Sequence, residues 1–172
     1  MMTNKILFNI IGFYLCWFIS IYAAANGNYY LGPISVIIFL LIHIIKIMNY
    51  NQEILFLLIC YFIGFFIDTM FLRFGIIEYH GILSSKFNIA PVWVTCLWVC
   101  FGSSISHSFR WFKRQYLYLA LLGAVSGPII YYSASSSGAL NFIVNNYHLL
   151  SVALCWSLFL PLIVYISDRL VD

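Results

Sequence analysis

Residues 54–72 read ILFLLICYFIGFFIDTMFL, an apolar run, and we expect its Asp68 to be the one ionisable side chain set well inside the apolar runs of the chain. As a helix rising about 1.5 Å per residue, this run is long enough to cross the roughly 30 Å hydrocarbon core of a bilayer. A charged side chain in hydrocarbon costs roughly 3 kcal/mol or more, so a carboxylate there needs partners or a function. The run therefore predicts a transmembrane helix that contains a polar site.

The composition of the whole chain agrees with a membrane location. Of its 172 residues, 64% are hydrophobic and only 8% are charged, whereas soluble domains carry about 25% charged residues. The polar connections between apolar runs are too short to form a separate domain outside the membrane. Residues 1–172 are therefore predicted to form a single integral membrane domain, and no nucleic-acid partner is expected.

Six apolar runs of spanning length are present, and none has the alternating pattern of a barrel strand. The runs are Ile6–Ala25, Leu31–Met48, Ile54–Leu72, Ile89–Ser106, Tyr116–Tyr132 and Tyr147–Ile166. Turn-forming Asn, Gly and Ser residues mark several of the connections. The predicted fold class is all-α, a polytopic bundle of six transmembrane helices.

The distribution of Lys and Arg predicts the orientation, because these residues resist translocation across the membrane. With six spans, one side carries Lys5, Lys46, Arg110, Lys113, Arg114 and Arg169, and the other carries Arg73 and Lys86. The richer side should be cytoplasmic, so both termini are predicted to lie there. Contact with lipid phosphate is an alternative reason for the Arg110, Lys113 and Arg114 cluster.

The first apolar run has some features of a secretory signal peptide. Lys5 precedes it, and the small residues Ala23, Ala24 and Ala25 end it. The run is longer than the usual apolar core of a signal peptide. We therefore expect an uncleaved first helix.

A polar site is predicted around Asp68 in the outer half of the membrane. Asp68 lies about 21 Å along its helix from the cytoplasmic end. Tyr131, Trp93 and His148 are expected at a similar depth and are predicted to converge with it on one pocket. Two interpretations remain open. The group accepts a proton or binds a polar headgroup, or Asp68 only fixes helix register by bonding a hydroxyl or the backbone near Pro128.

Small residues predict close contacts between helices. Gly123 and Gly127 are four residues apart in the fifth run, and Gly64 and Asp68 are four apart in the third. Such spacing lets another helix approach closely on that face. Pro128 should kink the fifth helix and free a carbonyl group. The Gly123–Gly127 face would join either two helices of one chain or two copies of the chain.

The sequence offers no convincing catalytic or metal-binding group. Ser103 and His107 are four residues apart, but such a pair usually bonds within its own helix, and no acid follows to orient the imidazole. Cys96 and Cys100 share a helix face, yet no second pair of Cys or His joins them at ligand spacing. We expect no catalytic residue, no metal and no cofactor, and this pattern favours a protein that is not an enzyme.

Several short motifs follow one another along the chain. They are Gly64-xxx-Asp68, Pro91-x-Trp93 with Leu97-Trp98, His107-Ser108-Phe109-Arg110-Trp111, and Gly123-xxx-Gly127-Pro128 with Tyr131. In this arrangement nearly the whole chain resembles the bacterial inner-membrane family called domain of unknown function 2878. The resemblance implies a small multi-pass inner-membrane protein without an assigned activity. The positions that match are Asp68, Trp93, Arg110, Gly127 and Pro128.

The resemblance also implies a link to lipid modification, since members are often encoded near a flavin oxidoreductase and a methyltransferase similar to cyclopropane-fatty-acid synthases.

One function class is an accessory or lipid- or small-solute-binding protein with a polar site around Asp68. Its partners would be membrane lipids, lipid-modifying enzymes or a second copy. The alternative is a small transporter or the vitamin-binding subunit of an importer. The chain lacks the Ala-xxx-Ala docking pattern of such subunits and an inverted repeat with broken helices.

Overall fold

The computed structural model of the chain describes residues 2–48, 51–82, 87–108, 112 and 114–171. These ranges contain the helices α1 (Met2–Ala25), α2 (Leu31–Lys46), α3 (Gln52–Arg73), α4 (Val92–Ser108), α5 (Tyr116–Ser136) and α6 (Asn146–Leu170). Each apolar run predicted to be a helix is confirmed as one. Two short strands that were not predicted, β1 (Glu78–Tyr79) and β2 (Leu140–Asn141), pair in antiparallel register.

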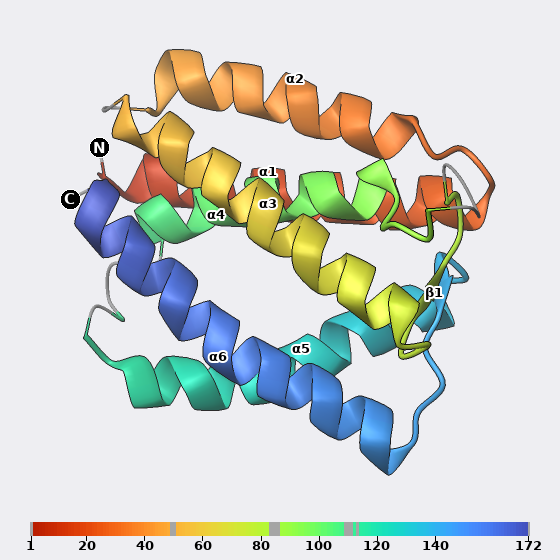
Figure 1. Cartoon of the computed structure of the whole chain (residues 1–172). Coiled ribbons are helices and arrows are strands. Elements are labelled where there is room, and N and C mark those ends of the chain that lie inside the picture. Colours follow the sequence, from red (N-terminus) through yellow and green to blue (C-terminus); the bar gives the residue numbers. More distant parts are fainter. Residues whose placement is uncertain (1, 49–50, 83–86, 109–111, 113, 172) are drawn as a thin grey trace.

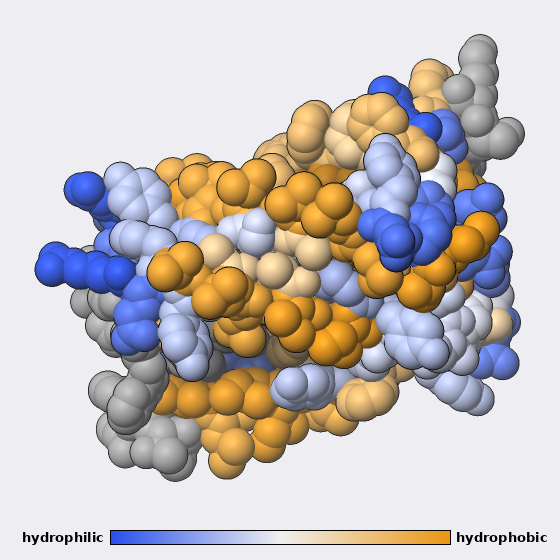
Figure 2. All heavy atoms as spheres, turned by 90° about the horizontal axis from the view of Figure 1, so that it is seen from below, coloured by the Kyte–Doolittle hydropathy of each residue, from blue (hydrophilic) through white to orange (hydrophobic). Residues whose placement is uncertain are grey.

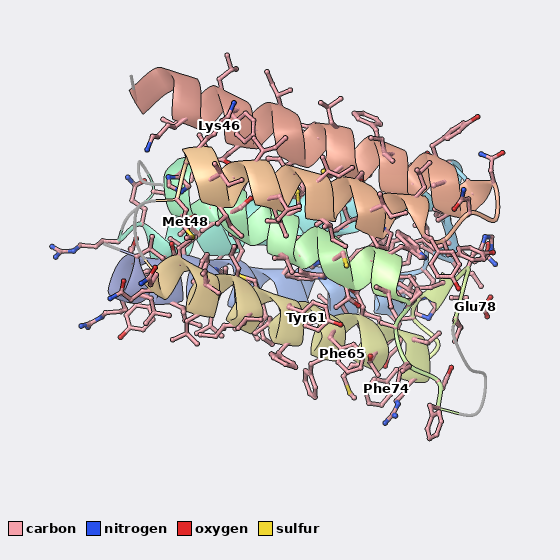
Figure 3. All side chains as sticks on the ribbon, turned by 90° about the horizontal axis from the view of Figure 1, so that it is seen from above. Lys46, Met48, Tyr61, Phe65, Phe74 and Glu78 are labelled. Carbon is pink, nitrogen blue, oxygen red and sulfur yellow. The ribbon has the colours of Figure 1, made fainter. Side chains whose placement is uncertain are left out.

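The helices alternate in direction, so both termini lie at the same end of the bundle (Figure 1). We call this the termini end, and we call the opposite end, which carries β1 and β2, the ribbon end. Figure 3 places Lys46 and Met48 at the termini end and Phe74 and Glu78 at the ribbon end. The chain thus crosses the bundle once with each helix.

Helix α4 occupies the centre of the bundle. It packs against α1, α2, α3 and α6, and nearly all of its described side chains are buried or half-buried. Its buried polar residues include Thr95, Ser103, Ser104 and Ser106. Helix α5, by contrast, packs mainly on α6 and makes no extensive contact with α1 in the described part of the chain. A central helix is shielded by its neighbours, which explains why these hydroxyl groups are buried there.

The outer surface is apolar, while polar side chains gather inside. Figure 2 shows a hydrophobic belt around the middle of the viewed face, with hydrophilic residues at both ends. Leu117 and Leu158 are exposed on this surface, whereas Asn9, Asp68 and Ser103 are completely buried. A protein in water normally shows the opposite distribution for charged and large apolar side chains. Exposed apolar side chains of this extent suit a lipid environment.

Four helical segments are long and apolar enough to cross a membrane in the described part of the chain. They are Lys5–Ala25, Gln52–Arg73, Tyr116–Ser136 and Asn146–Leu170. Helices α2 and α4 are apolar but shorter. The protein is therefore a membrane protein with a helical bundle that contains four helices of spanning length.

Close packing between α5 and α6 depends on two glycines. A Cβ atom added at Gly123 would overlap the carbonyl group of Trp156, and one added at Gly127 would overlap the indole ring of Trp156. The face that carries these glycines therefore contacts another helix of the same chain. Helix α5 continues through Pro128 as far as Ser136.

Adding one carbon at Gly123 should destabilise the bundle, because the carbonyl group of Trp156 belongs to a helical backbone and cannot easily move. We expect Gly123→Ala to lower stability by about 1–3 kcal/mol, the usual cost of overpacking. The matched control is Val125→Ile, which adds one carbon to a side chain of α5 that is 62% exposed. Thermal unfolding of both variants in detergent measures the difference. Equal midpoints would contradict the α5–α6 packing.

Candidate functional site

Asp68 of α3 is completely buried and accepts three hydrogen bonds from other elements. The hydroxyl groups of Tyr79 and Tyr131 each donate to Asp68 Oδ1 over 2.6 Å. The indole Nε1 of Trp98 donates to Asp68 Oδ2 over 2.7 Å. Hydrogen bonds to a charged acceptor are stronger than neutral ones, and three of them offset much of the cost of burying a carboxylate. We call these four residues the Asp68 cluster.

Local packing brings the donors to this carboxylate. The ring of Trp98 lies against Gly64, one helical turn before Asp68, where a side chain would overlap it. Tyr79 belongs to β1, whose pairing with β2 places Tyr79 opposite Leu140. Burial, with the Asp68 carboxyl close by, raises the pKa of Tyr79 well above its ordinary value. Tyr79 therefore remains protonated and able to donate.

A cavity of about 450 Å³ lies beside the Asp68 cluster, and Trp98 and Tyr131 form part of its wall. Its remaining lining comes mainly from α1, α4, α5 and α6 and is almost entirely aliphatic or aromatic. The indole Nε1 of Trp156, which also lines the cavity, is buried without a hydrogen-bond partner. The cavity wall is thus mainly apolar, and one of its residues carries a buried donor without a partner.

The other residues expected at this site, Trp93 and His148, lie in different places in the structure. Trp93 lines the cavity, donates its Nε1 to the carbonyl oxygen of His80 over 2.9 Å, and packs edge-on against Tyr79. His148 lies near the start of α6, with its Nδ1 2.9 Å from the carbonyl oxygen of Ile143. No hydrogen bond joins His148 to Asp68 among the described residues. Of the residues expected beside Asp68, Tyr131 donates a hydrogen bond to it directly. Trp93 contacts the cluster through the ring of Tyr79.

The basic residues expected to mark orientation are only partly described. Arg110 and Lys113 lie outside the described residues. Arg114 is exposed and precedes α5. A lipid-phosphate contact of this group therefore stays a prediction.

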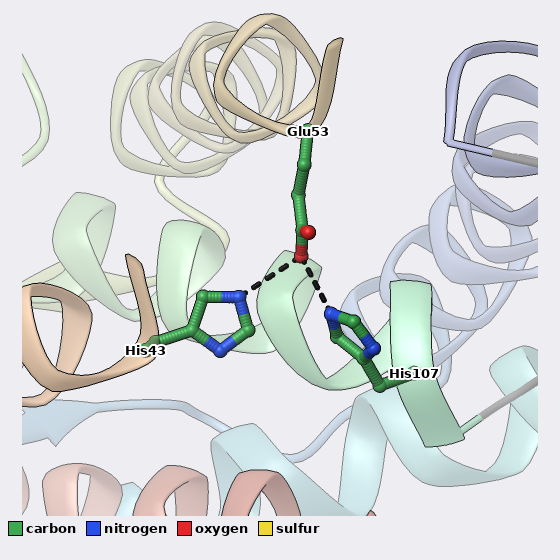
Figure 4. Close-up of side chains that lie close together, drawn as sticks. All are labelled: His43, Glu53 and His107. Atoms are coloured by element: carbon green, nitrogen blue, oxygen red, sulfur yellow. Dashed lines mark hydrogen bonds and ion pairs between the residues drawn. The ribbon is translucent and has the colours of Figure 1, made fainter. Parts of the chain in front are cut away.

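A second buried polar group lies at the termini end and was not predicted as a site. Glu53 Oε1, from the first turn of α3, is 2.9 Å from Nε2 of His43 in α2 and 2.9 Å from Nε2 of His107 in α4 (Figure 4). Ser106 Oγ donates to the same oxygen over 2.8 Å. His43 Nδ1 lies 2.8 Å from Oδ1 of Asn9 in α1. We call His43, Glu53 and His107 the His–Glu cluster.

The His–Glu cluster changes two interpretations of the sequence. Asp68 is not the only titratable side chain inside the bundle, because His43 and Glu53 are completely buried as well. An acid does orient the imidazole of His107, but it comes from α3 and not from the sequence after α4. Ser103 bonds the carbonyl oxygen of Cys100 in its own helix instead. The signal that could have identified the cluster is His43, a polar residue within the second apolar run that lies in the last turn of α2.

Removing one donor from Asp68 tests whether its hydrogen bonds hold the bundle together. We expect Tyr131→Phe to lower stability by about 1.5–3 kcal/mol, the usual contribution of a hydrogen bond to a charged group. Tyr132→Phe is the matched control, since it removes a hydroxyl group from the neighbouring side chain, which is 57% exposed. Thermal or urea unfolding in detergent compares them. A loss as large in the control would show that the buried bond contributes nothing special.

Comparison with known proteins places the chain in a family without an assigned activity. No curated protein and no solved structure matches the chain. The family described as protein of unknown function (DUF2878) matches residues 6–162, which include the Asp68 cluster, the cavity lining and the His–Glu cluster. The chain belongs to this family of proteins of unknown function, DUF2878.

Proposed function

We propose that this protein binds a lipid-like molecule with a long apolar chain inside the membrane. The observation that carries the proposal is the cavity of about 450 Å³ with an apolar and aromatic lining. Its volume falls in the range of about 300–1,000 Å³ that is typical of small-molecule sites. An apolar chain matches this lining, whereas a charged solute would lose its hydration without compensation.

The position of the cavity supports a ligand that comes from the bilayer. Its walls include Phe13 and Trp17 of α1 and Leu122 and Ile130 of α5, two helices that do not pack extensively against each other. A gap between two apolar helices admits a lipid chain sideways without exposing it to water. The unpaired Nε1 of Trp156 would donate to an oxygen of the ligand, such as an ester carbonyl.

Asp68 acts in this proposal as a positioning residue. Its three hydrogen bonds orient the rings of Trp98 and Tyr131, both of which line the cavity. These donors already occupy both carboxylate oxygens, so Asp68 has little capacity left to bind a ligand itself. Its role is therefore closer to fixing the helices than to carrying a proton.

The proposal also includes the location. All six helices cross a bacterial inner membrane, and both termini lie in the cytoplasm. Described basic residues support this orientation. Lys5 lies near the start of α1, Lys46 and Arg169 lie in the last turns of α2 and α6, and Arg114 precedes α5, and these helix ends all lie at the termini end (Figure 1). Helix α2 supports the sixfold crossing, because exposed Ile34, Ile37 and Leu41 turn an apolar face outward. A bound lipid is also consistent with an accessory role beside lipid-modifying enzymes.

Filling the cavity should abolish binding. We expect Ser126→Phe to reduce photo-crosslinking of a photoreactive fatty-acyl phospholipid at least about tenfold, because Ser126 lines the cavity and a phenyl ring would occupy it. Val125→Phe introduces the same ring at the neighbouring exposed position and should crosslink like the wild type. Crosslinked peptides located by mass spectrometry should come from α1 and α5. Unchanged crosslinking in Ser126→Phe would contradict the cavity as the site.

Reporter fusions test the proposed orientation separately. A fluorescent protein that matures only in the cytoplasm should be bright when fused after the C-terminus. Alkaline phosphatase, which folds only outside the cytoplasm, should be active when inserted at Asn28 in the α1–α2 connection. A dark fluorescent protein together with inactive phosphatase would invert the orientation. If the two reporters placed Asn28 and the C-terminus on the same side of the membrane, the five helices α2 to α6 could not all cross it.

A further inference from the structure

We propose that His43, Glu53 and His107 form a binding site for a divalent first-row transition-metal cation, with Zn²⁺ as the reference ion. The site lies at the termini end, apart from the Asp68 cluster, and does not depend on the proposed lipid ligand. It is assembled from three different helices, so it exists only in the folded bundle.

The ligand atoms already converge on one point. One ligand atom each of His43, Glu53 and His107 lies within 4.8 Å of the other two, and both Nε2 atoms face the carboxylate of Glu53 (Figure 4). Around a tetrahedral ion with bonds of about 2.0–2.2 Å, ligand atoms stand about 3.3–3.5 Å apart. The two N···O distances of 2.9 Å would therefore widen by only a few tenths of an ångström.

The hydrogen bonding of His43 fits a metal ligand. Its Nδ1 and Nε2 both face oxygen atoms, from Asn9 and Glu53 respectively, but a neutral imidazole has only one N–H group. Without a cation, His43 must be doubly protonated or the Asn9 amide must be turned over. With a cation on Nε2, Nδ1–H donates to Asn9 Oδ1, and both ring nitrogens of His43 are satisfied, while Nδ2 of Asn9 stays buried without a partner. An outer acceptor of this kind usually accompanies metal-bound histidine.

Glu53 carries an independent sign of a missing partner. Its Oε2 atom is buried and has no hydrogen-bond partner, while Oε1 has three. A buried carboxylate oxygen left unpaired is costly. A cation bound to the carboxylate would compensate Oε2 by direct coordination or through a bound water.

The donor set selects the class of ion. Two imidazole nitrogens and one carboxylate suit Zn²⁺ and its neighbours in the first transition row, whereas Mg²⁺ and Ca²⁺ prefer oxygen ligands. Three protein ligands leave at least one coordination position for water or another ligand. Within the described ranges, no further His, Cys, Asp or Glu joins these three residues at ligand spacing.

Metal binding by the purified full-length chain tests the proposal. The protein should be prepared in detergent through an affinity tag without histidine, stripped with chelator and dialysed against Zn²⁺. We expect one tightly bound Zn²⁺ per chain by elemental analysis, and none for Mg²⁺ or Ca²⁺. Co²⁺ should give the visible absorption of a nitrogen-coordinated ion of low coordination number. Failure of the wild type to bind Zn²⁺ or Co²⁺ would overturn the site.

Variants assign the ion to these residues. Glu53→Gln and His107→Gln should lose stoichiometric Zn²⁺, whereas His148→Gln, which removes a histidine outside the cluster, should keep it. Asn9→Leu keeps the number and branching of the side-chain heavy atoms and leaves the three ligands in place, so we expect it to fold and to bind about 10–100-fold more weakly. Binding that survives in Glu53→Gln and His107→Gln, or that is lost equally in His148→Gln, would overturn the assignment. Lipid crosslinking to the wild type is measured independently, so either proposal can fail alone.

Discussion

Inside a bilayer no water is available to solvate Asp68, and this constraint determines how the ribbon end of the bundle is built. Three donors must reach one carboxylate, and they come from β1, α4 and α5. The bond from Tyr131 matters most for the arrangement, because α5 otherwise packs chiefly on α6. It joins this outer helix to α3, beside the cavity. In a bilayer the hydrophobic effect does not drive helices together, because lipid tails are as apolar as the side chains. Polar contacts of this kind therefore help to specify the packing.

The central helix connects both polar clusters. Helix α4 supplies Trp98 to Asp68 and His107 with Ser106 to Glu53, while Gly64 and Gly102 let α3 and α4 approach. Glu53 and Asp68 lie about 22 Å apart along α3. The two helices are therefore joined by hydrogen bonds near both ends and by close apolar packing between them. This explains why α4 tolerates several hydroxyl groups, since those of Thr95, Ser103, Ser104 and Ser106 each find an acceptor within the bundle.

Helix positions could be predicted from the sequence because each apolar run is long and bounded by polar turns. Asp68 stood out for the same reason, since a lone acid in such a run needs partners. Its partner Trp98 did not stand out, because a tryptophan in an apolar run is ordinarily a packing residue. Glu53 was assigned to a connection, and His43 was overlooked in its run. Their meeting with His107 depends on how α2, α3 and α4 are arranged, which single-sequence periodicity does not contain.

The cavity and the His–Glu cluster approach each other through two residues. Ser104 lines the cavity, and its hydroxyl donates to the backbone carbonyl of Asn9 over 3.1 Å. The side chain of the same Asn9 faces His43. A change in the coordination of His43 would therefore act on Asn9, and Asn9 also anchors a residue of the cavity wall. The ion and the lipid of the two proposals would then contact one connected part of α1 and α4. A ligand that shifts the contact between Ser104 and Asn9 would change the affinity for the other ligand, and this coupling is reciprocal.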